Sequence, residues 1–216
     1  LISFHAYRGG EVRTALEEHL REAADLIADR RGICRLHFTV SAEHVQPVKS
    51  FLRLSVPRLE ERCGVRFHVD LSLQSPSTSI VAADGQARPF RDEEGCLVFR
   101  PGGHGALLQN LQRIDADLIF VKNIDNISPE SLQKKILPCK KVLGGLMIET
   151  RRQVYSCLRR LEQKSLSLPD LQAISDFCRD VLSADFPKEF PKLAAREKRQ
   201  WLFRRLNRPL RVCGMV

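Results

Sequence analysis

The stretch Cys34-Arg35-Leu36-His37-Phe38-Thr39-Val40 alternates apolar and polar residues, which predicts a short β-strand. A helical pattern follows from Ser41 to about Arg62, and Pro57 is expected to interrupt it. A second strand-like run extends from Val65 to Leu73. A strand, a helix and another strand in this order are typical of a parallel sheet with crossover helices. This stretch therefore predicts an α/β fold.

The flanking segments extend the same pattern. After Gly9-Gly10, apolar residues spaced three or four apart predict a helix that ends near Asp29. Cys96 to Arg100 and Ala116 to Ile124 predict two more strands, and the second is expected at the centre of the sheet because its apolar run does not alternate. The predicted core, residues 1–127, is a Rossmann-like, mostly parallel sheet with flanking helices.

The pattern becomes helical after this core. Residues 128–207 predict an all-helical insertion or lid, and residues 208–216 predict a strand that returns to the core sheet. Because Leu1 is not an initiator methionine and the last residues stop inside a strand-like run, we expect the chain to be part of a longer protein.

Length and composition indicate a globular cytoplasmic protein. The 216 residues are 43% hydrophobic, enough for a full core, and no apolar run has the length of a membrane span. No signal peptide is evident at the N-terminus. The seven cysteines form no CxxC pair and are odd in number, so we expect reduced thiols rather than disulfides or a zinc site.

A net charge of +9 suits an anionic partner, and much of the excess lies late in the chain. The basic residues there are Lys192, Arg196, Lys198, Arg199, Arg204, Arg205, Arg208 and Arg211. A helix of this composition is more often a solvated face than a nucleic-acid surface, so the sequence favours the solvated face.

A glycine-rich turn, Arg100-Pro101-Gly102-Gly103-His104-Gly105, lies between a predicted strand and a helix expected from about His104 to Arg113. Free backbone N–H groups at such a turn favour a phosphate, and His104 would lie within reach of it. Arg100 is the best cationic candidate because its guanidinium can pair with a phosphate through two hydrogen bonds. A tight turn with a capping histidine is the structural alternative.

Asn123-Ile124-Asp125-Asn126 closes the predicted central strand at the edge where open α/β sheets bind ligands. Asp125 is the best candidate for a metal ligand, and a lone carboxylate suits Mg²⁺, which shares its remaining positions between water and substrate phosphates. Asp115 and Asp117 lie at the opposite edge and are interpreted as a turn. The other five histidines are interpreted as ordinary surface or core residues.

Gln74 ends the second strand at the edge that also carries Asp125. Because an amide is both a donor and an acceptor, Gln74 could pair with the edge of a nucleobase.

These three elements together resemble the UDP-sugar pyrophosphorylases, in particular the UDP-glucose and UDP-N-acetylhexosamine branch of the GT-A-type nucleotidyltransferases. That family has a glutamine at a strand end, a Pro-Gly-His-Gly-like turn before a helix, and a strand that closes on Asn-x-Asp-Asn. The same order occurs here as Gln74, residues 101–105 with one additional glycine, and residues 123–126. Residues 74–78, 99–107 and 211–216 also look like a bacterial family of domains of unknown function related to these enzymes.

The resemblance implies a GT-A fold that binds UTP, a sugar phosphate and Mg²⁺. It implies that Gln74 faces the base, that Gly102, Gly103, His104 and Gly105 lie beside the base and phosphate, and that Asp125 lies near the metal and sugar phosphate. Asn123 is a further candidate for cofactor binding. The family's N-terminal glycine-rich loop and downstream lysine have no counterpart in this sequence.

Three functional hypotheses follow. The first is a nucleotidyltransferase that forms a nucleotide sugar and releases pyrophosphate, with Asp125 and Arg100 as catalytic residues. The second is a catalytically inactive module that binds a nucleotide sugar. The third, disfavoured by the interpretation of the basic helix as a solvated face, is a nucleic-acid-binding protein that uses residues Leu193 to Leu206.

Overall fold

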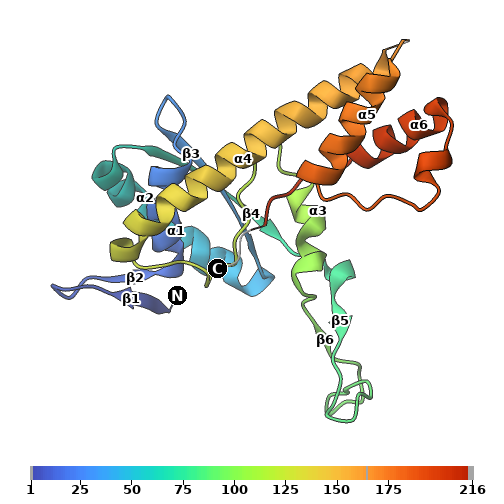
Figure 1. Ribbon diagram of the computed structural model, residues 1–216. Helices are drawn as coiled ribbons and strands as arrows, with labels where there is room; N and C mark the ends of the chain where they lie inside the picture. Colours follow the sequence, from blue (N-terminus) through green and yellow to red (C-terminus); the bar gives the residue numbers. More distant parts are fainter. Residues whose placement is uncertain (1, 164, 214–216) are drawn as a thin grey trace. The chain divides into compact units, whose positions relative to one another are not determined.

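The computed structural model describes residues 2–163 and 165–213 and divides into two compact units (Figure 1). Unit 1 is Leu1–Leu137 and unit 2 is Pro138–Val216. The division falls within helix α4 (Glu130–Glu162), beyond the boundary expected at residue 127.

Unit 1 begins with a hairpin that leads directly into a helix. Strands β1 (Ser3–Ala6) and β2 (Val12–Thr14) are antiparallel, and α1 (Ala15–Leu26) follows. Thr14 and Glu17 form a capping box that satisfies two backbone N–H groups at the start of α1. The predicted helix is therefore confirmed in type, but it starts at Ala15 because the residues just before it pair with β1.

The strand, helix and strand predicted at the centre of the fold are confirmed. They are β3 (Ile33–Val40), α2 (Val45–Cys63) and β4 (Arg66–Leu73), and β3 and β4 are parallel along their whole length. Pro57 does not interrupt α2, contrary to the prediction. Leu52 and Leu59 are buried on either side of Pro57, and their packing holds the helix together across the missing backbone hydrogen bond.

The two faces of this parallel pair differ in polarity, and α1 and α2 cover only the apolar one. Cys34 pairs with Phe67 and Leu36 with Val69, and these residues pack in one core with α1 and α2. The alternate residues are polar on both strands: Arg35, His37 and Thr39 on β3, and Arg66, His68, Asp70 and Ser72 on β4. A sheet covered on one side explains the alternation seen in the sequence.

The extended Rossmann-like sheet predicted from the sequence is wrong, although the mixed α/β composition is confirmed. In the described residues, β3 and β4 are the only parallel pair. Within the predicted strand 96–100, only β6 (Phe99–Arg100) forms, and it pairs antiparallel with β5 (Ile80–Val81) in a ribbon that continues into a long loop (Figure 1).

Residues 116–124, predicted as the central strand, form no strand. Lys122 Nζ lies 2.7 Å from Glu22 Oε2, and the Ile124 carbonyl lies 3.0 Å from His19 Nε2, so this segment follows α1 instead of pairing with the sheet. Val121 is 70% exposed, unlike a residue of a central strand. An apolar run alone does not distinguish a buried strand from an irregular segment of which only one side is buried.

A buried ionic network joins the hairpin to α1 and to the start of α4. Arg13 Nε donates to Glu11 Oε1 at 2.7 Å, and Arg13 Nη1 donates to Glu130 Oε2 at 2.8 Å. Glu18 is completely buried, and its Oε1 accepts hydrogen bonds from Tyr7 and His5. Its Oε2 has no hydrogen-bond partner but lies 3.8 Å from Arg13 Nη1, so Arg13 supplies the compensating charge.

Because of this network, the stability of the chain depends on pH in the acidic range. Hydrogen bonds from Arg13 and Arg62 lower the pKa of Glu11 from 4.5 to about 2. Because the folded pKa is the lower one, Glu11 contributes stability above pH 4.5, and this contribution is lost as the pH falls towards 2. We expect the urea midpoint to decrease as the pH is lowered from 4.5 to about 2. The decrease should be smaller in Glu11→Gln, which has no titratable group at that position. An equal decrease of the urea midpoint with pH in the two proteins would contradict the prediction.

Unit 2 is helical in its described residues, as predicted for this part of the chain. The C-terminal part of α4 packs with α5 (Leu168–Asp176), a π-helical turn (Phe177–Val181) and α6 (Ala195–Leu206). Leu161, Ile174 and Leu202 are almost completely buried in the core. Residues 208–213 form no strand, and residues 214–216 of the strand predicted at 208–216 lie outside the described residues. None of the helices in the described ranges is long and apolar enough to span a membrane.

All seven cysteines are free thiols, as the sequence predicts. Cys34, Cys157 and Cys178 are buried in the two cores, and burial raises the pKa of Cys178 to about 11. Such thiols remain protonated at neutral pH and act as small apolar core residues.

Candidate functional site

Polar side chains meet at the carboxyl ends of β3 and β4, on the face of the sheet that α1 and α2 do not cover. Ser72 Oγ lies 2.7 Å from His37 Nε2 and 3.2 Å from Thr39 Oγ1. Asn110 Nδ2 donates to Ser72 Oγ and to the Leu73 carbonyl, both at 2.8 Å. The carboxyl edge of a parallel sheet is where α/β proteins bind ligands, so this network marks the candidate site.

Asn110 connects this edge to the glycine-rich turn. It lies in α3 (Leu108–Leu111), directly after a 3₁₀ turn (His104–Leu107), and is only 4% exposed. Its two hydrogen bonds to β4 hold the segment that follows the glycines against the end of that strand. Burial of an amide requires such partners, which gives Asn110 a fixed structural role.

The structure brings Gln74 and the glycine-rich turn together. A Cβ at Gly102 would lie 2.5 Å from the Thr78 carbonyl oxygen and 3.6 Å from Gln74 Nε2, so only glycine fits there without a shift of the backbone. Gln74 Nε2 donates to Thr78 Oγ1 at 3.2 Å, and Thr78 Oγ1 donates to the Ser75 carbonyl at 2.6 Å. These bonds fix the Gln74 amide beside the turn, while its carbonyl oxygen makes no hydrogen bond within the described part of the chain.

The helix predicted after the turn is shorter than expected. The segment from His104 is a 3₁₀ turn followed by the four residues of α3, in place of a continuous helix to Arg113. So short a helix adds little dipole, and any phosphate contact depends on the backbone of Gly103, His104 and Gly105, which are exposed. Arg100, at the end of β6, is also exposed.

The third predicted element lies beside α1. Asn123 and Asp125 are exposed in the irregular segment beside α1, anchored by Lys122 and by the Ile124 carbonyl. Neither residue forms a hydrogen bond or an ion pair with Gln74 or the turn in the ranges that the structure describes. Asp125 thus has open space for a ligand but no fixed orientation towards the other two elements.

The residues present supply little of a metal site on their own. Within residues 2–163 and 165–213, no three His, Cys, Asp or Glu side chains lie close enough to hold a metal ion together. Asp125 offers a single carboxylate. It could bind a Mg²⁺ ion only if phosphate groups and water molecules supplied the other ligands of the metal.

Sequence reasoning missed the polar network itself. The sequence predicts an ordinary surface or core histidine at His37 and no role for Thr39, Ser72 or Asn110. The signal was present as polar residues at every second position of both strands, which places them on one face of the sheet.

The fold and site define a mixed α/β chain in which a short parallel sheet presents a polar site at its carboxyl edge. The chain belongs to the family described as Domain of unknown function (DUF4301), whose model matches residues 1–216. This agrees with the resemblance to a family of domains of unknown function. Searches of curated proteins and of solved structures found no match to this chain.

Proposed function

We propose that unit 1 is a nucleotidyltransferase-like domain that binds a nucleoside triphosphate, UTP in the first place, together with a sugar phosphate and Mg²⁺. The observation that supports the proposal is the position of Gly102, where a Cβ would lie 3.6 Å from Gln74 Nε2, so that an amide able to pair with a base lies beside a glycine-rich turn at the carboxyl edge of a parallel sheet. The resemblance to the UDP-sugar pyrophosphorylases supplies the substrate class. The free cysteine thiols are compatible with a reducing cytoplasm, where these nucleotides occur.

In this proposal each residue acts by positioning or by charge. Gln74 pairs with the uracil edge, and the backbone of Gly102, Gly103, His104 and Gly105 lies along the base and the phosphates. Arg100 neutralises phosphate charge, and Asn123 and Asp125 face the sugar phosphate. Mg²⁺, when bound at Asp125, would supply further neutralisation of the triphosphate.

The proposed reaction needs no covalent enzyme intermediate. An oxygen of the sugar phosphate attacks the α-phosphorus of the nucleotide, a new P–O bond forms, and the bond to the bridging oxygen of the β-phosphate breaks. Pyrophosphate leaves with that oxygen. Orientation of the two substrates and stabilisation of the developing negative charge are the contributions that this chain could make.

Calorimetric titration tests the nucleotide site. With Mg²⁺ present, we expect the chain to bind UTP in preference to ATP, CTP and GTP, and Gln74→Ala to weaken UTP binding by about tenfold or more, since paired hydrogen bonds to the base are lost. Gln46→Ala is a matched control because Gln46 is exposed on α2 and is not a predicted site residue. No binding of any nucleotide, or equal weakening by the control, would remove the proposal.

The second candidate is a catalytically inactive module that binds a nucleotide sugar. It is favoured by one observation: the segment that carries Asp125 is held beside α1 by Lys122 and the Ile124 carbonyl. The two candidates differ in pyrophosphate release from UTP and a panel of sugar phosphates. The enzyme would release pyrophosphate and lose this activity in Asp125→Ala but not in Asp115→Ala, whereas the module would bind nucleotides and release none.

A further inference from the structure

The excess positive charge of the protein lies entirely in unit 2. Unit 1 contains eighteen Lys and Arg residues and eighteen Asp and Glu residues. Unit 2 contains seventeen basic and eight acidic residues, which accounts for the whole net charge of +9. An anionic partner of this chain would therefore be attracted to unit 2.

Within unit 2 the charge is concentrated around α6, where carboxylates do not neutralise it. Residues 192–211 contain eight Lys and Arg residues and one acidic residue, Glu197, whose carboxylate accepts a hydrogen bond from the Ala194 backbone. Ion pairs occur elsewhere in unit 2, such as Arg160 with Asp170 and Arg179 with Asp176. In the described residues, none of the eight basic side chains around α6 pairs with a carboxylate.

The basic side of α6 faces away from the core. Leu202 and Leu206 are buried in unit 2, and Trp201 packs against Phe186 and Phe190 with ring centroids 4.6 Å and 5.0 Å away. On the exposed side lie Arg196, Gln200 and Arg204, four residues apart, and Arg208 follows the end of the helix, where its Nε donates to the Arg204 carbonyl at 3.2 Å. From Arg196 to Arg204 they cover about 12 Å of helix, more than a single phosphate group can contact.

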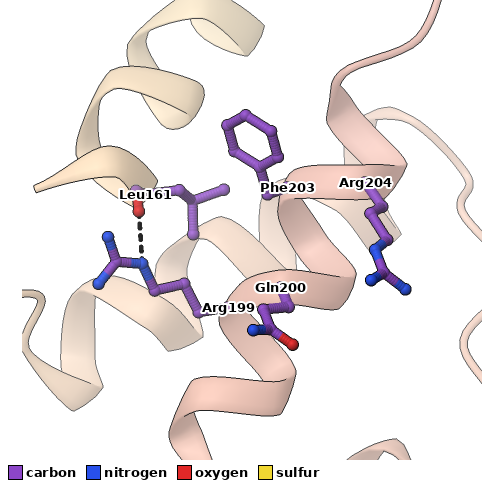
Figure 2. A pocket seen from close by; sticks show the side chains of 5 residues that line it. All are labelled: Leu161, Arg199, Gln200, Phe203 and Arg204. Atoms are coloured by element: carbon purple, nitrogen blue, oxygen red, sulfur yellow. Dashed lines mark hydrogen bonds between the residues drawn. The ribbon is translucent and has the colours of Figure 1, made fainter.

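An open cavity on this side is lined by N–H donors. Figure 2 shows Arg199 and Arg204 on either side of Gln200, with Phe203 and Leu161 beside them. Arg199 Nε donates to the Leu161 carbonyl, which fixes the guanidinium while its terminal nitrogens stay available. Among the described residues no carboxylate lines this cavity, so it suits a phosphate group.

We propose that the α6 surface, defined as Arg196, Arg199, Gln200, Arg204 and Arg208, binds the phosphate backbone of a nucleic acid. A lipid surface fits less well, because a membrane-bound helix exposes its apolar side, and the apolar residues of α6 are packed in the core. Most of the basic residues around α6 are arginines, which pair with phosphates in a bidentate manner. This inference revises the solvated face expected from the sequence, and it does not depend on the proposed function of unit 1.

Fluorescence anisotropy with a labelled single-stranded oligonucleotide and a labelled duplex tests the inference on the full chain. We expect binding that weakens steeply with salt, because each phosphate contact releases counterions. Arg204→Gln with Arg208→Gln should weaken binding by about tenfold or more at low salt and reduce the slope of log K against log salt by about two.

The matched control is Arg53→Gln with Arg58→Gln, which removes the same charge from exposed positions of α2 in unit 1. We expect this control to bind like the unchanged protein. Circular dichroism would verify that both double variants remain folded. Absence of binding at low salt, equal weakening by the control, or binding to phosphatidylserine vesicles without binding to oligonucleotides would overturn the inference.

Discussion

Gly102→Ala is expected to destabilise unit 1 and to abolish nucleotide binding there. The new methyl group would lie 2.5 Å from the Thr78 carbonyl oxygen, a backbone atom that moves only with its segment. Such overpacking costs about 1–3 kcal/mol in the free energy of unfolding. Because the shift would separate the turn from Gln74, UTP binding should fall beyond detection. Urea unfolding followed by circular dichroism and calorimetric titration would measure the two effects.

Gly103→Ala is the control for this substitution. A Cβ at Gly103 has no atom within 4 Å, and its φ of −67° suits any residue. We expect the free energy of unfolding to change by less than about 0.5 kcal/mol, as for most surface substitutions. Equal destabilisation by the two alanines would show that the turn does not lie against Thr78. Normal UTP binding by Gly102→Ala would show that the turn is not part of the nucleotide site.

Arg13→Ala is expected to have the largest effect on stability. The guanidinium is 4% exposed, contacts Glu11 and Glu130, and lies 4.3 Å from the centre of the Tyr7 ring. Its removal would leave the completely buried Glu18 without a nearby cation. Loss of one member of a buried ion pair costs about 3–5 kcal/mol, so we expect a large fall in the urea midpoint.

Arg62→Ala provides the comparison, because Arg62 pairs with the same Glu11 carboxylate at 2.8 Å but is 48% exposed. An exposed ion pair contributes at most about 1 kcal/mol, so this variant should remain close to the unchanged protein. Similar decreases of the urea midpoint in the two variants would show that the contribution of the network to stability does not depend on its burial.

Residues close together in the chain determined much of unit 1. Alternation in residues 34–40 and 65–73, with an amphipathic helix between them, was enough to predict β3, α2 and β4 with their parallel pairing. The capping box at Thr14 and the left-handed Gly64 after α2 also act through neighbouring residues. Such interactions are specified by local spacing, so the sequence alone reveals them.

Long-range contacts decided what the sequence could not. Residues 116–124 have the composition of a buried strand, but the bonds of Lys122 to Glu22 and of the Ile124 carbonyl to His19 draw them along α1. In the described residues the parallel sheet therefore has two strands, and no strand leads to Asp125.

The candidate sites show the same division. The motifs of Gln74 and the glycine-rich turn could be found in the sequence, whereas their contact, and the network of His37, Thr39, Ser72 and Asn110, required the folded chain. The basic residues around α6 were visible as composition, but only packing showed which side of that helix is buried and that, in the described residues, no carboxylate pairs with the basic side chains of the other side. The sequence by itself determined the local elements and the residue types at each site, because these depend on neighbours in the chain. Tertiary structure alone decided which of them meet, because burial and charge pairing depend on residues that are distant in sequence.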